Sequence, residues 1–151
     1  MLNQSMLDHP LYKPYNINTM KIKRAIISAA IVWAIVVTAY ILSYFVEILE
    51  NPELQANIAL TLALIPAVIL GAKYYYKNGA ETHGFKLGVF MFLVTICFDA
   101  LITVPLFIIP AGGSHLSFFG DAWFWFIGLE YIVVVGIYAT VGIKILDESV
   151  S

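Results

Sequence analysis

Two acidic residues lie in the middle of long apolar stretches, and they are the best candidates for chemistry in this chain. Asp99 stands in residues 92–103 and Glu130 in residues 125–133, where most neighbours are apolar. An ionisable side chain at the centre of a bilayer costs about 2.5 to 3.5 kcal/mol, so it usually marks a functional site or a contact with a partner. Two carboxylates close together in a low dielectric cannot both ionise cheaply, so such a pair shares a proton or holds a cation.

The depths of Asp99 and Glu130 can be compared if each apolar stretch is one membrane-spanning helix. At 1.5 Å per residue, Asp99 lies about 18 Å and Glu130 about 20 Å from the inner ends of their predicted helices. Consecutive helices joined by a short loop are usually neighbours, so the two carboxyl groups can face each other. Thr95 and Thr103 share the helical stripe of Asp99, and Tyr40 lies at a similar depth in the first apolar stretch. The predicted binding site therefore consists of Asp99, Glu130, Thr95, Thr103 and Tyr40.

A purely structural role is the alternative for the same two acids. Protonated Asp99 and Glu130 can act as hydrogen-bond clamps between helices, each contributing about 1 kcal/mol. The sequence leaves the two roles about equally open. Pro66 and Pro105 also lie inside the predicted spans. Each proline removes a backbone donor and frees a carbonyl, which must find another hydrogen-bond partner within the membrane.

Other kinds of active site find no support in the sequence. Cys97 is the single cysteine, which rules out a disulfide within the chain and a cysteine-rich metal site. His9, His83 and His115 fall in segments predicted to lie apart, so they cannot form one metal site. Phosphate-binding and hydrolase motifs are missing. We therefore expect no catalytic residue, no metal and no cofactor, and a net charge of −2 gives no reason to expect nucleic-acid binding.

The composition indicates which elements must position these residues. Of 151 residues, 61% are hydrophobic and only 12% are charged, whereas about a quarter are charged in soluble domains. Four apolar runs, at about residues 25–46, 54–76, 87–109 and 122–143, are each long enough for one crossing. The sequence therefore predicts an all-α polytopic membrane protein with one four-helix transmembrane domain over residues 25–146. A polar segment, 1–24, precedes this domain, and a short tail, 147–151, follows it.

The distribution of charge predicts how the four spans are oriented. Basic residues occur before the first span, between the second and third spans, and after the fourth span: Lys13, Lys21, Lys23, Arg24, Lys73, Lys77, Lys86 and Lys144. The other two loops carry acidic residues instead: Glu47, Glu50, Glu53 and Asp121. Positively charged loops are retained in the cytoplasm, so both termini are predicted to be cytoplasmic in a prokaryotic inner or plasma membrane. The bilayer is then the main partner, and either a homodimer or a larger membrane partner is compatible with the sequence.

Three segments carry a resemblance to a known group of sequences: residues 20–28, residues 98–107, and residues 118–123 together with Glu130. In them the chain resembles a family of small, uncharacterised four-helix prokaryotic membrane proteins. The resemblance covers most of the chain and implies the four-helix architecture, but it implies no activity. It singles out Asp99, Pro105, Asp121, Trp123 and Glu130.

Two other classes are similar in part. In size and number of spans the chain is similar to small multidrug exporters, which carry a membrane-embedded Glu in the first span. Here the first span has no carboxylate before Glu47. Residues 121–123 with Glu130 also resemble sterol-isomerase-like membrane domains, over a very short stretch.

Three functions are compatible with these observations. The first is binding, or transport, of a proton-coupled cation or small amphipathic molecule through the acidic residues in the membrane. The second is a non-catalytic membrane subunit or scaffold that packs against a partner. The third is a membrane enzyme that modifies a lipid, with the acids as general acid and base.

Overall fold

The computed structural model describes residues 20–77 and 79–142. The first part of the predicted polar segment, the predicted tail, His9, Lys13 and Lys144 lie outside the described residues. Within the described ranges every regular element is a helix. The elements are α1 (Ile22–Ser43), α2 (Pro52–Tyr76), α3 (Gly84–Phe98) with its π-helical continuation η2 (Asp99–Ile108), α4 (His115–Phe119), and α5 (Ala122–Ile137) with its π-helical continuation η3 (Tyr138–Gly142).

The predicted all-α fold with four membrane-spanning helices is confirmed. In the part of the chain that the structure describes, four helical stretches are long and apolar enough to cross a membrane: α1, α2, α3 with η2, and α5 with η3. Each overlaps one predicted apolar run. The boundaries differ by a few residues, because α1 ends at Ser43 and α3 begins at Gly84.

Local sequence explains where α2 and α4 begin. The Asn51 side chain accepts a hydrogen bond from Leu54 N, and Pro52 occupies the first turn, where its missing N–H costs nothing. Ser114 and Ser117 form a reciprocal capping box at the start of α4. Both helices therefore begin at residues with the right local chemistry.

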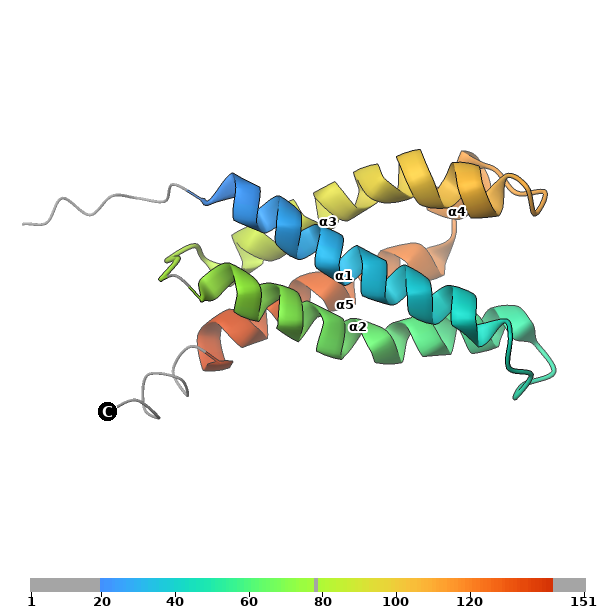
Figure 1. Cartoon of the computed structure of the whole chain (residues 1–151), viewed down its shortest axis with the longest axis horizontal. Coiled ribbons are helices and arrows are strands. Elements are labelled where there is room, and N and C mark those ends of the chain that lie inside the picture. Colours follow the sequence, from blue (N-terminus) through green and yellow to red (C-terminus); the bar gives the residue numbers. More distant parts are fainter. Residues whose placement is uncertain (1–19, 78, 143–151) are drawn as a thin grey trace, which may run out of the picture.

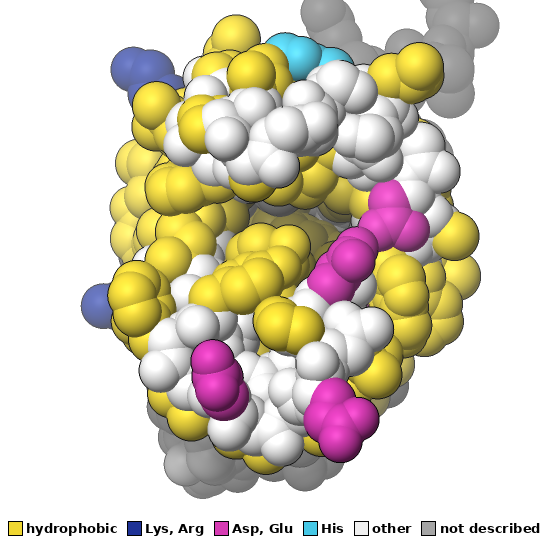
Figure 2. Space-filling model, turned by 90° about the vertical axis from the view of Figure 1, so that its right-hand side faces the viewer, with side chains coloured by type: hydrophobic (Ala, Val, Ile, Leu, Met, Phe, Trp, Pro, Cys, Tyr) yellow, Lys and Arg dark blue, Asp and Glu magenta, His cyan; other side chains and the backbone are white. Residues whose placement is uncertain are grey.

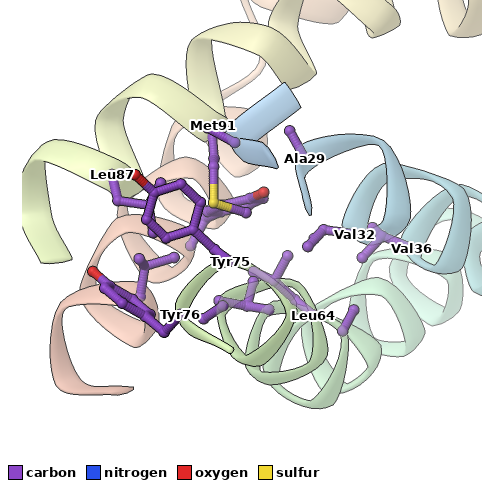
Figure 3. Packing of buried hydrophobic residues seen from close by; sticks show 14 of the residues in the cluster. Ala29, Val32, Val36, Leu64, Tyr75, Tyr76, Leu87 and Met91 are labelled. Carbon is purple, nitrogen blue, oxygen red and sulfur yellow. The ribbon is translucent and has the colours of Figure 1, made fainter. Parts of the chain in front are cut away.

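The four spans form an elongated bundle with connecting loops at its two ends (Figure 1). α1 packs mainly against α2, and α3 packs mainly against α5. Small residues allow the close approach of α1 and α2: Gly71 lies against Val32 and the backbone of Ser28. The buried core gathers between α1, α2, α3 and α5, and Figure 3 shows Tyr75 beside Leu87 and Met91 within it.

The third span changes its helical geometry at Asp99. From Asp99 to Ile108 the chain is π-helical, and this segment contains Pro105. π-Helical turns are rare and occur frequently at functional sites. Besides α3, which it continues, η2 packs chiefly against the short helix α4. The η2 half of the third span therefore leaves space beside α1, α2 and α5.

Candidate functional site

A cavity of about 290 Å³ occupies this space in the half of the bundle that contains α4. Residues of all four spans and of α4 line it. Seven aromatic side chains contribute to its wall: Trp33, Tyr40, Phe92, Phe107, Phe118, Phe124 and Tyr131. Figure 2 shows the corresponding end of the bundle, where the surface is hollowed between the helices and acidic side chains stand around the opening. The site is thus an aromatic and apolar chamber within the predicted membrane region.

Asp99 is held in this chamber by two neighbours. Thr103 Oγ1 donates a hydrogen bond to Asp99 Oδ1 at 2.7 Å. Trp33 Nε1 lies 3.1 Å from the same Oδ1 and 3.1 Å from Thr103 Oγ1. Asp99 and Thr103 are each only 7% exposed. These donors orient the carboxyl group through Oδ1, and no described residue forms a hydrogen bond with Oδ2.

Two further predicted site residues line the same cavity. The Thr95 hydroxyl donates to the carbonyl of Met91 at 3.1 Å within its own helix. The Tyr40 hydroxyl shares a hydrogen bond of 3.1 Å with the hydroxyl of Tyr44. Thr95, Thr103, Asp99 and Tyr40 therefore face one chamber, although only Thr103 contacts the Asp99 carboxyl group.

Glu130, in contrast, is not among the residues that line the cavity. Gly84 lies against Gly136 and Gly88 lies against Ile132, which sets an antiparallel register between α3 and α5. Continuing that register places Asp99 opposite residue 121, and Glu130 is about 14 Å further along α5 at 1.5 Å per residue. The two acids therefore lie at different depths rather than at the predicted common level. Glu130 Oε2 is buried and has no hydrogen-bond partner among the described residues.

Polar residues mark the end of the chamber that lies at the starts of α2 and α5. Glu53, Asn57, Ser117 and Asp121 line the cavity and also a second hollow of about 330 Å³. That hollow includes Trp123 as well. A solute approaching from this end passes acidic side chains before it reaches the aromatic walls.

Sequence reasoning did not include two residues that contact this region. Trp33 belongs to the first span, and its indole N–H reaches Asp99 across 66 positions of sequence. His115 of α4 lies 3.0 Å from the carbonyl of Ala100, next to Asp99. Of the two, only Trp33 could have been predicted from its residue type, because a buried indole N–H requires a hydrogen-bond acceptor.

Residues 48–141 match a family of unknown function (DUF5367). The chain belongs to this family. Membership confirms the predicted relationship to an uncharacterised family, while the four apolar helices identify a multi-pass membrane protein. The range shared with DUF5367 contains Asp99, Thr103 and His115, whereas Trp33 and Tyr40 precede it. No curated protein and no solved structure matches the chain.

Proposed function

We propose that this protein binds a small amphipathic cation in the outer cavity, with Asp99 as its counter-ion. The observation that carries the proposal is a buried carboxyl group on the wall of a mainly apolar and aromatic chamber. Isolated ionised carboxylates are strongly unfavourable in such surroundings unless a positive group pairs with them. A ligand that brings one positive charge and an apolar body satisfies both the carboxyl group and the wall.

The aromatic wall supports an organic cation rather than a metal ion. Hard metal cations take about six or more oxygen ligands, and the described residues hold no group of three or more His, Cys, Asp or Glu side chains suited to a metal. An ammonium group within about 6 Å of an aromatic face is instead attracted by the ring. Trp33, Tyr40 and Phe92 provide aromatic rings on the wall of the cavity that Asp99 also lines.

The acidic outer end supports access from that side. Glu53 and Asp121 line both the cavity and the hollow outside it, so the local potential favours a cation. At the inner half, Tyr75, Leu87 and Met91 are fully buried. Transport across the membrane would therefore require this inner core to open, and the binding step precedes that movement.

Calorimetry on the protein in lipid nanodiscs tests the proposal. The probe is benzyltrimethylammonium, and its uncharged carbon analogue, neopentylbenzene, is the control ligand. We expect the cation to bind and Asp99→Asn to weaken its binding about 30-fold or more, as truncating a buried charge partner does. Glu130→Gln is the matched control, since it makes the same carboxyl-to-amide change outside the cavity, and it should leave the affinity unchanged.

Two results would contradict a cation site. One is equal affinity for the cation and its neutral analogue, and the other is equal affinity in Asp99→Asn and the wild-type protein. The first result would make the chamber a site for neutral apolar molecules, and the second would show that Asp99 is not the counter-ion.

A role as a membrane subunit is the second candidate, and Glu130 favours it. Its Oε2 has no hydrogen-bond partner among the described residues, while Phe126 and Ile137 on the same helix are more than half exposed. A partner helix that packs on these exposed apolar side chains would cover the face of α5 that carries Glu130. Glu130→Gln should then reduce copurification of that partner without affecting cation binding.

A further inference from the structure

The carbonyl oxygen of Ala100 lacks the backbone donor that its helical register would provide. In a π-helix each N–H bonds the carbonyl five residues earlier, as Ile109 N bonds Val104 O at 2.9 Å. Five residues after Ala100 stands Pro105, which has no N–H. A carbonyl freed in this way within a membrane must find another donor.

His115 lies where it can supply that donor. Its ring Nε2 is 3.0 Å from Ala100 O, and since a carbonyl only accepts, Nε2 carries the proton. The imidazole also stacks on Phe119 of the same helix, with the ring planes 25° apart. The first residue of α4 is therefore hydrogen-bonded to the backbone of the residue that follows Asp99.

Helix α4 covers part of the cavity that contains Asp99. Ser117 and Phe118 of α4 line the cavity, and Phe118 also packs on Phe124 of α5 at 5.3 Å between ring centroids. The helix has only five residues. It follows Gly112, whose φ of +91° lies in the region that favours glycine. A short helix between a glycine turn and a bundle can move as a unit if its attachments break.

We propose that α4 is a lid over the Asp99 cavity and that the His115 to Ala100 hydrogen bond is its latch. His115 is then a positioning residue that sets how readily an organic cation reaches Asp99. The identity of the ligand rests on the function proposed above, whereas the movement of the lid can be measured without any bound ligand. Pro105 is the reason that the latch exists, because it leaves the Ala100 carbonyl free.

Cysteine accessibility tests the lid in reconstituted liposomes. The background variant is Cys97→Ser, and Thr95→Cys places a reporter thiol on the cavity wall. The probe is 2-(trimethylammonium)ethyl methanethiosulfonate, which is positively charged and water-soluble. We expect His115→Ala to increase the modification rate about tenfold, the change that loss of one net hydrogen bond produces in an opening equilibrium. His115→Gln, which keeps a donor, should stay near the background rate.

Pro105→Ala provides a second test of the same contact. This substitution supplies a backbone N–H, so Ala100 O no longer needs His115, and adding His115→Ala to Pro105→Ala should change the rate less than twofold. His83→Ala is the matched histidine control, because His83 stands before α3 at the opposite end of the bundle. It should leave the rate unchanged.

Three outcomes would overturn the lid. The first is an unchanged rate in His115→Ala, and the second is an equal acceleration by His115→Ala with and without Pro105→Ala. The third uses Ala67→Cys in the fully buried core: if His115→Ala accelerates its modification equally, His115 holds the whole bundle together rather than a lid. If the lid opens as expected but calorimetry detects no cation binding, the lid stands and the ligand assignment fails.

Discussion

At the scale of single residues, Gln55 illustrates how this bundle satisfies the backbone of a connector. Its Oε1 accepts hydrogen bonds from Ile48 N and Leu49 N, each at 2.8 Å. Its Nε2 donates to the carbonyls of Ser43 and Val46. The side chain is nearly buried. One amide thus supplies two acceptor contacts and two donor contacts to the turn between α1 and α2.

Gln55→Glu should destabilise the protein although the two side chains have the same shape. A carboxylate cannot donate, so the carbonyls of Ser43 and Val46 lose their donor, and we expect the free energy of unfolding to fall by about 2 kcal/mol or more. Thermal unfolding in detergent measures the loss. Glu50→Gln, on the same connector but exposed, is the control. A midpoint equal to that of the control would show that these contacts contribute nothing.

At the scale of elements, the spacing between α3 and α5 depends on glycine. A Cβ atom added to Gly88 would lie 3.1 Å from both the Cα and the carbonyl oxygen of Ile132. Because these are backbone atoms, they cannot rotate out of the way. Gly84 makes an equally close contact with Gly136. Small residues at such positions let membrane helices approach closely.

Gly88→Leu should therefore force α3 and α5 apart. We expect a loss of about 2 kcal/mol or more in stability, as for other overpacked interfaces, and a lower thermal midpoint in detergent. Val89→Leu is the matched control, because Val89 is 45% exposed and also acquires a larger side chain. If both variants unfold at the same temperature, the glycine contact does not limit helix packing.

At the scale of the whole molecule, charge divides the bundle into two ends. Basic residues of the described chain lie at one end: Lys21, Lys23, Arg24, Lys73, Lys77 and Lys86. Glu47, Glu50, Glu53 and Asp121 lie at the other end, where the cavity opens. Arg24 has a structural role as well, because it donates to the carbonyls of Tyr74 and Tyr75 at the last turn of α2.

The charge division predicts that the cavity opens away from the cytoplasm. In intact cells carrying the Cys97→Ser variant, a membrane-impermeant thiol reagent should label Glu50→Cys and should not label Lys77→Cys. A permeant reagent should label both, which controls for accessibility. The reverse pattern would place both termini outside and would direct the Asp99 cavity toward the cytoplasm.

The four spans could be predicted because hydropathy is a local property of the chain. A run of about 20 apolar residues must satisfy its backbone as a helix in a membrane, whatever its neighbours are. Residues 122–137, for example, include Trp123 and Gly128 as well as Glu130, and they are still one helix. The helical periodicity also grouped Thr95, Asp99 and Thr103, which face one cavity. Their role in binding stays a prediction.

The depth of Glu130 relative to Asp99 could not be predicted in the same way. Counting from helix ends assumes that neighbouring helices begin and end at one level. The actual stagger depends on where Gly84 and Gly88 allow α5 to approach. A shift of a few residues in this contact moves one carboxyl group out of reach of the other.

The sequence by itself determined that the protein is helical and that four segments can span a membrane. It also determined that the Asp99 carboxyl group and the carbonyl freed by Pro105 need hydrogen-bond partners inside the membrane. Only the tertiary structure decided which residues are those partners: Trp33 donates to Asp99, and His115 lies at the carbonyl left free by Pro105. The physical reason is the range of the interactions. Burial of an apolar helix in lipid needs no particular partner, whereas a hydrogen bond needs two specific atoms about 3 Å apart, and packing of distant segments alone sets that distance.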